Sequence, residues 1–269
     1  LNKTGVNIMK TFIKLLVPLT VILCLLGCDN KPTDAVMKSN SGNAIETHFY
    51  NEFLACNAGP DYSEANLKKE IAEFNTLNLS DEIYWIGGYA PVEGKNTNSN
   101  GWWEIQWSSE EASQIGWQEW RADEKAQAWN EGFKAVLDCD ETTIFGYETQ
   151  IPVPESMALK SWDRFVAAEI ACTFNDGKTA ENLETVVKEF TQWVEDNGTG
   201  EEFSFGVYIP VAEDQADFWW YNWHADFDSM ARGNANWEAN GKQMAARLEE
   251  TATCVDPNLY NGAEFYSTD

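Results

Sequence analysis

Polar and aromatic side chains alternate along one predicted strand in the second half of the sequence, and their types are those that bind or activate small molecules. Residues 218–224 read Phe-Trp-Trp-Tyr-Asn-Trp-His. Because successive side chains of a strand point to opposite faces, Trp220, Asn222 and His224 share one face. An imidazole beside a carboxamide and an indole is suited to holding an aromatic ligand or to moving a proton. This face is therefore the centre of a candidate site.

A similar strand is predicted over residues 102–108, where Glu104 and Gln106 share the polar face. We expect the tryptophan-rich faces, which carry Trp103 and Trp223, to pack under helices. The mixed faces then point into a cleft between two sheets, and an aromatic cleft with few polar groups is the usual form of a ligand site. A tyrosine on each preceding strand extends it. The predicted ligand-binding residues are Tyr89, Glu104, Gln106, Tyr208, Trp220, Asn222 and His224.

These residues do not by themselves establish that the protein is an enzyme. His224 and Asp226 have the spacing of half a facial iron triad, but the triad needs a second histidine downstream and the sequence has none. The sequence also lacks Gly-x-Ser-x-Gly, a Walker loop and His-Glu-x-x-His. It therefore predicts no metal site and no cofactor. A general-base role for His224, with Asp226 to orient it, stays open.

The elements that must position these residues occur twice. Markers of one copy, such as Cys56 and Phe74, recur 116 residues later as Cys172 and Phe190. Further matches at offsets of 116 or 117 are Trp103 with Trp219, Trp107 with Trp223, Gly116 with Gly233 and Trp120 with Trp237. The sequence therefore predicts two homologous units, repeat 1 over residues 47–150 and repeat 2 over 164–269, joined by a linker at 151–163.

The sequence pattern of each unit predicts the order strand, helix, two strands, helix, strand. Ser63 and Thr179 are placed to cap the first helix of their units, because a hydroxyl there accepts an N–H of the first turn. One helix is expected after the third strand in each unit. The order is the split βαβ, ferredoxin-like arrangement, and the fold class is α+β. Two such units in one chain resemble the dimeric α+β barrel superfamily, which includes the antibiotic-biosynthesis-monooxygenase-like and NIPSNAP-like proteins. The resemblance implies a pseudo-dimeric barrel within one chain and hence a monomer.

Four cysteines remain for the folded part once Cys24 and Cys28 are assigned to the N-terminal segment. Three pairings into two disulfides are possible. In the ferredoxin-like order the last strand lies beside the first, so the end of strand one meets the start of strand four. The fold therefore favours Cys56 with Cys139 and Cys172 with Cys254. A structural role is expected, since no Cys-x-x-Cys occurs.

The N-terminal segment predicts the cellular address. Lys10 and Lys14 precede an apolar run too short to span a bilayer, as in a signal peptide, here residues 1–27. The run ends Leu-Leu-Gly-Cys, which resembles the lipobox of bacterial lipoproteins and implies acylation of Cys28. Asp29 implies retention at the inner membrane, and residues 28–46 read as a flexible tether. We expect a lipid-anchored protein of the cell envelope that faces the periplasm.

The net charge of the chain disfavours one class of binding partner. The net charge of −26 disfavours nucleic acid as a partner, because phosphate recognition relies on cationic contacts. The leading hypothesis is a membrane-tethered lipoprotein that binds a small, partly apolar ligand in the aromatic cleft between the repeats. The alternatives are a cofactor-independent monooxygenase or isomerase of the barrel type, in which His224, Asn222 and Tyr208 position the substrate, and a non-catalytic structural or interaction module. A surface that stacks glycans on exposed tryptophans is a further alternative.

Overall fold

The computed structural model describes residues 38–39, 44–96, 100–154 and 157–268; the expected signal peptide, Cys28 and most of the expected tether lie outside these ranges. The strands are β1 (Lys38–Ser39), β2 (Ala44–Ala58), β3 (Ile83–Pro91), β4 (Gly101–Trp107), β5 (Leu137–Pro154), β6 (Phe165–Phe174), β7 (Phe203–Pro210), β8 (Phe218–His224), β9 (Ala252–Cys254) and β10 (Asn258–Ser267). The helices are α1 (Glu64–Phe74), α2 (Glu110–Ala122), α3 (Glu124–Phe133), α4 (Ala180–Asn197), α5 (Phe227–Asn240) and α6 (Lys242–Glu249).

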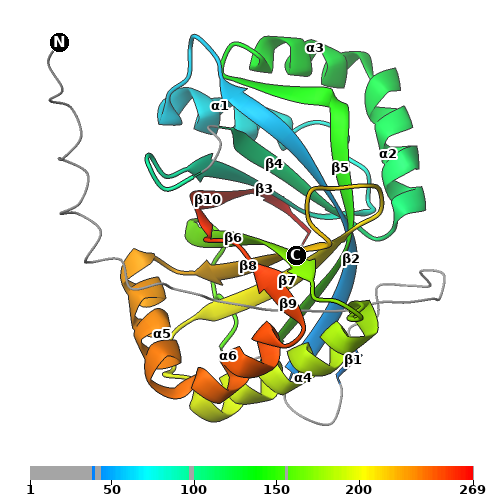
Figure 1. The fold of residues 1–269 in the computed structure, drawn as a ribbon. Coiled ribbons are helices and arrows are strands. Elements are labelled where there is room, and N and C mark those ends of the chain that lie inside the picture. The colour runs from blue at the N-terminus through cyan, green and yellow to red at the C-terminus, as the bar shows by residue number, and fades with distance from the viewer. Residues whose placement is uncertain (1–37, 40–43, 97–99, 155–156, 269) are drawn as a thin grey trace, which may run out of the picture.

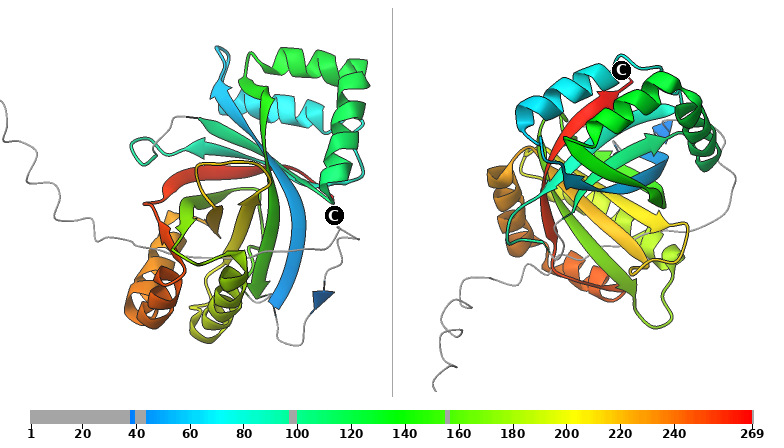
Figure 2. Two further views of the ribbon diagram at one scale, coloured as in Figure 1. Left: turned by 45° about the vertical axis from the view of Figure 1, so that its right-hand side comes forward. Right: turned by 90° about the horizontal axis from the view of Figure 1, so that it is seen from above.

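The strands form an antiparallel sheet that closes on itself. Its order is β2-β4-β3-β10-β6-β8-β7-β5, and β5 pairs with β2 to complete the ring. The short strands β1 and β9 add to β2 and β6. Closure removes the free edges that an open sheet of this size would expose. Figure 2 shows the strands curving around a common interior.

The barrel consists of two halves with the same topology. The N-terminal half has the order β3-β4-β2-β5 and the C-terminal half the order β7-β8-β6-β10, so the first strand of each half lies between its third and fourth strands. This is the ferredoxin-like order. The halves join where β3 pairs with β10 and where β5 pairs with β7. The predicted fold class, an α+β pseudo-dimeric barrel, is confirmed.

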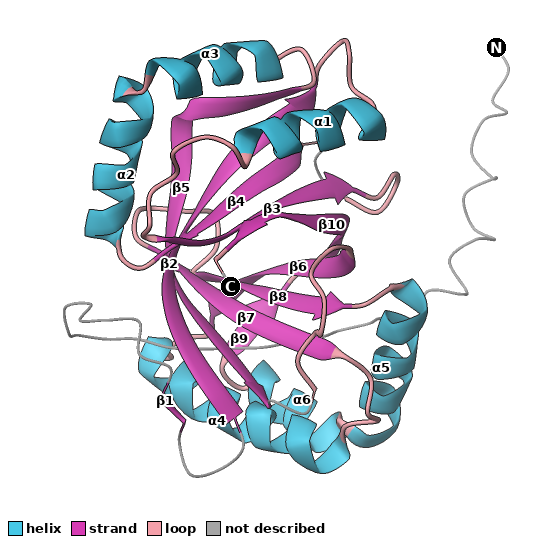
Figure 3. Cartoon of the chain, turned by 180° about the vertical axis from the view of Figure 1, so that it is seen from behind, coloured by secondary structure: helices cyan, strands magenta, loops and turns pink. Residues whose placement is uncertain are grey.

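Helices cover the outside of each half. In Figures 1 and 3, α1, α2 and α3 lie on the N-terminal half, and α4, α5 and α6 lie on the opposite side of the barrel. The predicted caps are confirmed: the Ser63 hydroxyl accepts the Asn66 N–H, and Thr179 starts α4 in a capping box with Asn182. Among the described helices, none has the length and apolar character needed to cross a membrane.

The expectation of one helix after the third strand was wrong in both halves. Asp123 leaves the helical conformation and accepts hydrogen bonds from the N–H groups of Lys125 and Ala126, which ends α2 and caps α3. In the C-terminal half Gly241 separates α5 from α6. Each pair of short helices follows the curved surface of the sheet, which a straight helix of the same length would leave.

Two segment boundaries differ from the expectation. β5 pairs with β2 as far as Pro154, opposite Ala44. The first residues of the expected linker, 151–163, therefore belong to a strand, and the last residues of the expected tether, 28–46, belong to β1 and β2. The paired ends of β2 and β5 extend beyond the barrel as a two-stranded ribbon, in which each strand is the hydrogen-bonding partner of the other.

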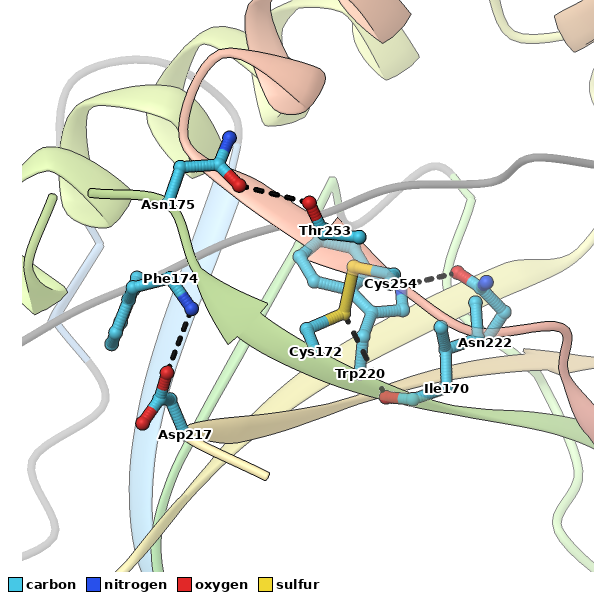
Figure 4. The surroundings of a disulfide bond; sticks show 9 residues. All are labelled: Ile170, Cys172, Phe174, Asn175, Asp217, Trp220, Asn222, Thr253 and Cys254. Carbon is cyan, nitrogen blue, oxygen red and sulfur yellow. Dashed lines mark hydrogen bonds between the residues drawn. A yellow bond between two sulfur atoms is a disulfide. The ribbon is translucent and has the colours of Figure 1, made fainter. Parts of the chain in front are cut away.

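Both predicted disulfides are confirmed. Cys56 bonds to Cys139 and Cys172 bonds to Cys254, and in each case the two residues face each other across paired strands. Figure 4 shows the second disulfide beside the indole of Trp220. The first bridge therefore ties β2 to the start of β5, and the second ties β6 to β9, the short strand that precedes β10.

Candidate functional site

The interior of the barrel is packed with aromatic rings. Phe53 stacks on Tyr221 with centroids 5.8 Å apart and meets Tyr208 edge-on at 5.5 Å. The cluster has its buried members on strands of both halves: Phe53, Trp85, Tyr89, Tyr147, Phe165, Tyr208, Tyr221, Trp223 and Tyr260, with Leu159 and Ala167. The expected open cleft between two sheets is therefore wrong for this part of the molecule, because side chains fill it.

A buried carboxylate joins the two halves in this interior. Glu104 is fully buried and accepts hydrogen bonds from the hydroxyls of Tyr89 at 2.5 Å and Tyr208 at 2.7 Å, and from Asn51 Nδ2 at 2.5 Å. Gln106 also bonds to it. Burial raises the pKa of Glu104 to about 7, against the lowering effect of these donors. Three of the other predicted ligand-binding residues, Tyr89, Tyr208 and Gln106, thus bind to Glu104.

A second carboxylate lies in the C-terminal half of the same interior. Glu169 accepts hydrogen bonds from the hydroxyls of Tyr221 at 2.6 Å and Tyr260 at 3.2 Å, and from Asn258 Nδ2 at 2.9 Å. Burial raises the pKa of this carboxyl as well. Each buried acid therefore has the several donors that a buried carboxylate requires.

The other three predicted residues, Trp220, Asn222 and His224, lie on the outer face of β8, under the helices. Trp220 is fully buried among residues of α4 and α6, whereas Trp223 lies inside the barrel. The predicted faces are therefore correct for β4 and inverted for β8.

The inversion has a simple cause. Cys56 pairs with Gly101 in one half and Cys172 pairs with Phe218 in the other, so the offset between β4 and β8 is 117 residues and not 116. A change of one residue in register moves every side chain of a strand to the other face. Trp103 therefore corresponds to Trp220, and Trp107 to His224.

A pocket of about 490 Å³ lies on this outer face, between the sheet and helices α4 and α5. We call it the C-terminal pocket. Its volume is in the range of small-molecule sites. Asn222 and His224 contribute its polar side chains from β8, and aromatic and aliphatic side chains form most of the remaining wall. The other lining residues are Lys95, Met157, Ala168, Ile170, Phe190, Trp193, Val194, Gly198, Thr199, Glu201, Phe203, Met230, Gly233, Asn234, Asn236, Trp237, Asp256, Pro257 and Leu259.

The corresponding region of the N-terminal half is nearly filled. There the carboxylate of Glu52 accepts hydrogen bonds from Trp107 Nε1 at 2.9 Å and Trp117 Nε1 at 2.6 Å. A space of only about 70 Å³ remains between the helices and the sheet. Two indoles and a carboxylate thus occupy the volume that is open on the other side.

Smaller residues stand at these three positions in the C-terminal half. Strand register and the helix caps place Ala168 where the other half has Glu52, His224 where it has Trp107, and Asn234 where it has Trp117. All three line the C-terminal pocket. The pocket is therefore open because these side chains are small, on a scaffold that the two halves share.

His224 is the buried titratable group of this pocket. Its side chain is 5 % exposed, and its Nδ1 has no hydrogen-bond partner among the described residues. Burial lowers the pKa of His224 to about 4, although Asp226 and Glu201 act in the opposite direction. The imidazole is therefore neutral at pH 7, with an unpaired nitrogen.

Asn222 is oriented by its neighbour on the strand. Trp220 Nε1 donates to Asn222 Oδ1 at 2.7 Å, as Figure 4 shows. Because this bond engages the amide oxygen, the Nδ2 group is the part of Asn222 that can donate to a ligand. Asn222 and His224 are two residues apart on β8, so both face the same side of the strand.

The pocket residues on the helices were not predicted. Trp237 was noted only as the match of Trp120, and Trp193 and Asn234 belong to no motif. The signal was nevertheless present, because the 117-residue offset that matches Gly116 with Gly233 also matches Trp117 with Asn234. A tryptophan replaced by a small polar residue at a core position indicates a cavity. The part of the chain that the structure describes holds no group of three or more acidic, histidine or cysteine side chains that could bind a metal.

Comparison with known proteins supports the fold. No family model matches the chain, and no curated protein matches it in sequence. A candidate monooxygenase from Lactobacillus acidophilus NCFM is 10 % identical, with a TM-score of 0.50 over 81 % of this chain and 94 % of that chain. A mutant of chlorite dismutase from Candidatus Nitrospira defluvii is 14 % identical, with a TM-score of 0.49 over 81 % and 92 %. At 10 % identity the likeness to the Lactobacillus protein shows a common fold and nothing about function.

Proposed function

We propose that this chain binds a small, partly apolar molecule in the C-terminal pocket. The observation that carries the proposal is the largely apolar cavity of about 490 Å³, beside which the buried Nδ1 of His224 has no partner in the described part of the chain. A buried polar atom without a hydrogen bond costs about 1–3 kcal/mol, and a ligand that supplies the bond recovers this cost. The nearly filled region of the N-terminal half supports the proposal, because the same fold is stable without such a cavity.

The proposed binding site therefore lies on the outer face of one sheet, and not between the two sheets as the sequence suggested. The interior residues Tyr89, Glu104 and Tyr208 satisfy one another and leave their hydrogen-bonding groups engaged. They support the site from behind, because Trp223 of β8 donates from its Nε1 to Tyr89 at 3.3 Å. The side chains that would contact the ligand are those on the other face of the same strand.

Native mass spectrometry of the purified protein tests the proposal. The full chain is expressed in a bacterial host and isolated in a detergent that preserves bound molecules. We expect a bound species of small mass in the parent and its loss in His224→Trp, which places an indole in the cavity. An unliganded parent that also fails to bind the apolar probe pyrene would support the structural-module alternative.

A cofactor-independent oxygenase or isomerase is the second candidate. The observation that favours it is the same neutral His224, since an imidazole that lines a largely apolar pocket, with Nδ1 unpaired among the described residues, is placed to take a proton from a bound substrate. The lowered pKa makes it a weak base, so substrate acidity would have to provide part of the driving force. Incubation of the co-purified molecule with fresh protein in air, followed by mass analysis, separates turnover from simple binding.

We also propose that Cys28 is acylated and tethers the domain to the bacterial inner membrane. The proposal rests on the Leu-Leu-Gly-Cys sequence after the apolar run and on Asp29. Two disulfides in the folded domain support an oxidising compartment such as the periplasm. The strongly negative domain would be repelled by anionic lipid, so acyl chains would provide the attachment.

A further inference from the structure

We propose that the C-terminal pocket selects a neutral, flat aromatic molecule whose hydroxyl group hydrogen-bonds to both His224 and Asn222. This inference rests on the proposed ligand binding and adds the chemical class of the ligand. Three properties of the pocket carry it: the aromatic wall, the pair of polar groups on β8 and the distribution of charge.

The wall on α4 and α5 consists of aromatic rings in contact. Phe190 and Trp193 are stacked with centroids 5.8 Å apart, and Trp237 meets Trp193 edge-on at 4.8 Å. Met157 and Met230 also line the cavity, and thioethers make favourable contacts with aromatic ligands. A flat ring system can face these surfaces over a large area, and rings of this kind add about 0.5–1.5 kcal/mol for each well-oriented pair.

The polar groups on β8 are one acceptor and one donor. The neutral imidazole of His224 can accept at Nδ1, and the amide of Asn222 can donate from Nδ2, because its oxygen is engaged by Trp220. A hydroxyl group can donate and accept at once. One hydroxyl placed between the two side chains therefore satisfies both, which a carbonyl or a simple hydrocarbon cannot do.

The charges around the imidazole disfavour an anion. Asp226 and Glu201 lie close enough to His224 to oppose the lowering of its pKa by burial, so they create a negative potential at this end of the pocket. Glu201 is itself paired with Arg232 through two hydrogen bonds of 2.8 Å. A carboxylate at the position of the hydroxyl would thus meet like charge and a neutral imidazole. A cation would lose its hydration among apolar walls.

Four fluorescent probes of one shape test the inference: 1-hydroxypyrene, pyrene, pyrene-1-carboxylate and 1-pyrenemethylammonium. They are titrated at pH 7 against the full-length protein and its variants. We expect 1-hydroxypyrene to bind about 10-fold more tightly than pyrene, as one hydrogen bond would give, and the two charged probes to bind less tightly than 1-hydroxypyrene.

The variants assign the preference to the imidazole. His224→Phe keeps a ring but removes Nδ1, so it should lose most of the preference for 1-hydroxypyrene, and any preference that remains belongs to Asn222. His224→Leu serves the same purpose if circular dichroism shows that the phenylalanine variant does not fold. The control His48→Phe changes an exposed histidine on β2 and should keep the 10-fold preference.

The outcomes separate the two proposals. Equal affinities of pyrene and 1-hydroxypyrene for the parent would overturn the hydroxyl preference and leave ligand binding intact. Tightest binding of a charged probe would also overturn it. If no probe binds and the purified protein carries no small molecule, both the inference and the proposed function fail.

Discussion

His224 of β8 occupies the position in the C-terminal half that Trp107 of β4 occupies in the N-terminal half. Each residue lies two positions before the N-cap of the next helix, and each faces the helices that cover its sheet. The indole of Trp107 fills its half together with Trp117, whereas the smaller imidazole borders an open pocket. One substitution at equivalent positions thus explains much of the asymmetry of the barrel.

Exchange of these two side chains is the first prediction. His224→Trp should abolish pyrene binding with the fold retained, because an indole fits the equivalent position of the other half. The converse variant, Trp107→His, should leave pyrene binding unchanged. It should lower the free energy of unfolding by about 3 kcal/mol, since it removes packed apolar volume and a partner of the buried Glu52. Fluorescence titration and urea denaturation supply the two measurements. If a folded His224→Trp variant bound pyrene as well as the parent does, pyrene would bind outside the C-terminal pocket.

The buried Glu104 gives a prediction for stability against pH. Its folded-state pKa of about 7 lies above its ordinary value of 4.5, so the folded protein holds a proton that the unfolded chain releases. The stabilisation from this group is complete below pH 4.5 and is lost as the pH rises through 7. Glu104→Gln cannot titrate, so the loss of stability between pH 5 and 8 should shrink by about 3 kcal/mol. Urea denaturation of both proteins across this range is the measurement. Parallel pH profiles would show that Glu104 is already ionised in the folded state.

The sequence could predict the fold and the disulfides but only part of the site. The order of the elements and the positions of the cysteines depend on local patterns, and both are present twice. The face of β8 depends on a single residue of register, and the repeated tryptophans suggested a match of Trp107 with Trp223 that the strand pairing does not have. Asn222 and His224 were selected for their chemistry and do line a pocket, although not in the predicted place.

The sequence could not predict that side chains fill the interior of the barrel, and the reason is a different one. Glu104 was placed on an inward face correctly, but a carboxylate on such a face suits both a ligand site and a buried hydrogen-bond network. The choice depends on whether Tyr89, Tyr208 and Asn51, which come from three other strands, reach the same oxygen atoms. Such convergence becomes visible only when the barrel is closed.

The disulfides give the third prediction. The bridges close loops of similar length, with separations of 83 and 82 residues, so the loss of either should cost a similar free energy of about 4 kcal/mol. The paired variants are Cys56→Ala with Cys139→Ala and Cys172→Ala with Cys254→Ala. Only the second pair should also weaken pyrene binding, because Cys254 leads directly into pocket residues Asp256 and Pro257. Equal effects on binding from both pairs would mean that the disulfide supports the fold alone.

The fourth prediction concerns the membrane anchor. Cys28→Ala should yield a protein that takes up no labelled palmitate and that leaves the membrane fraction, because the thiol is the group to which the lipid is attached. Folding of the barrel should be unaffected, with the same thermal melt as a parent chain released from the membrane in detergent. Persistent labelling of the alanine variant would refute the lipobox interpretation.

The fifth prediction tests the central claim, that the cavity beside His224 is a ligand site. The sequence has only two histidines, His48 and His224, so the protein labelled with ¹⁵N in its imidazole rings gives two sets of signals. The exposed His48 serves as the internal reference, while burial should keep His224 neutral until the pH approaches 4. Addition of pyrene at pH 7 should shift the His224 signals through the ring current of the bound probe and leave those of His48 in place. The account would be contradicted if the His224 signals did not shift when pyrene is added, or if they titrated near pH 6.5 as in an unfolded chain.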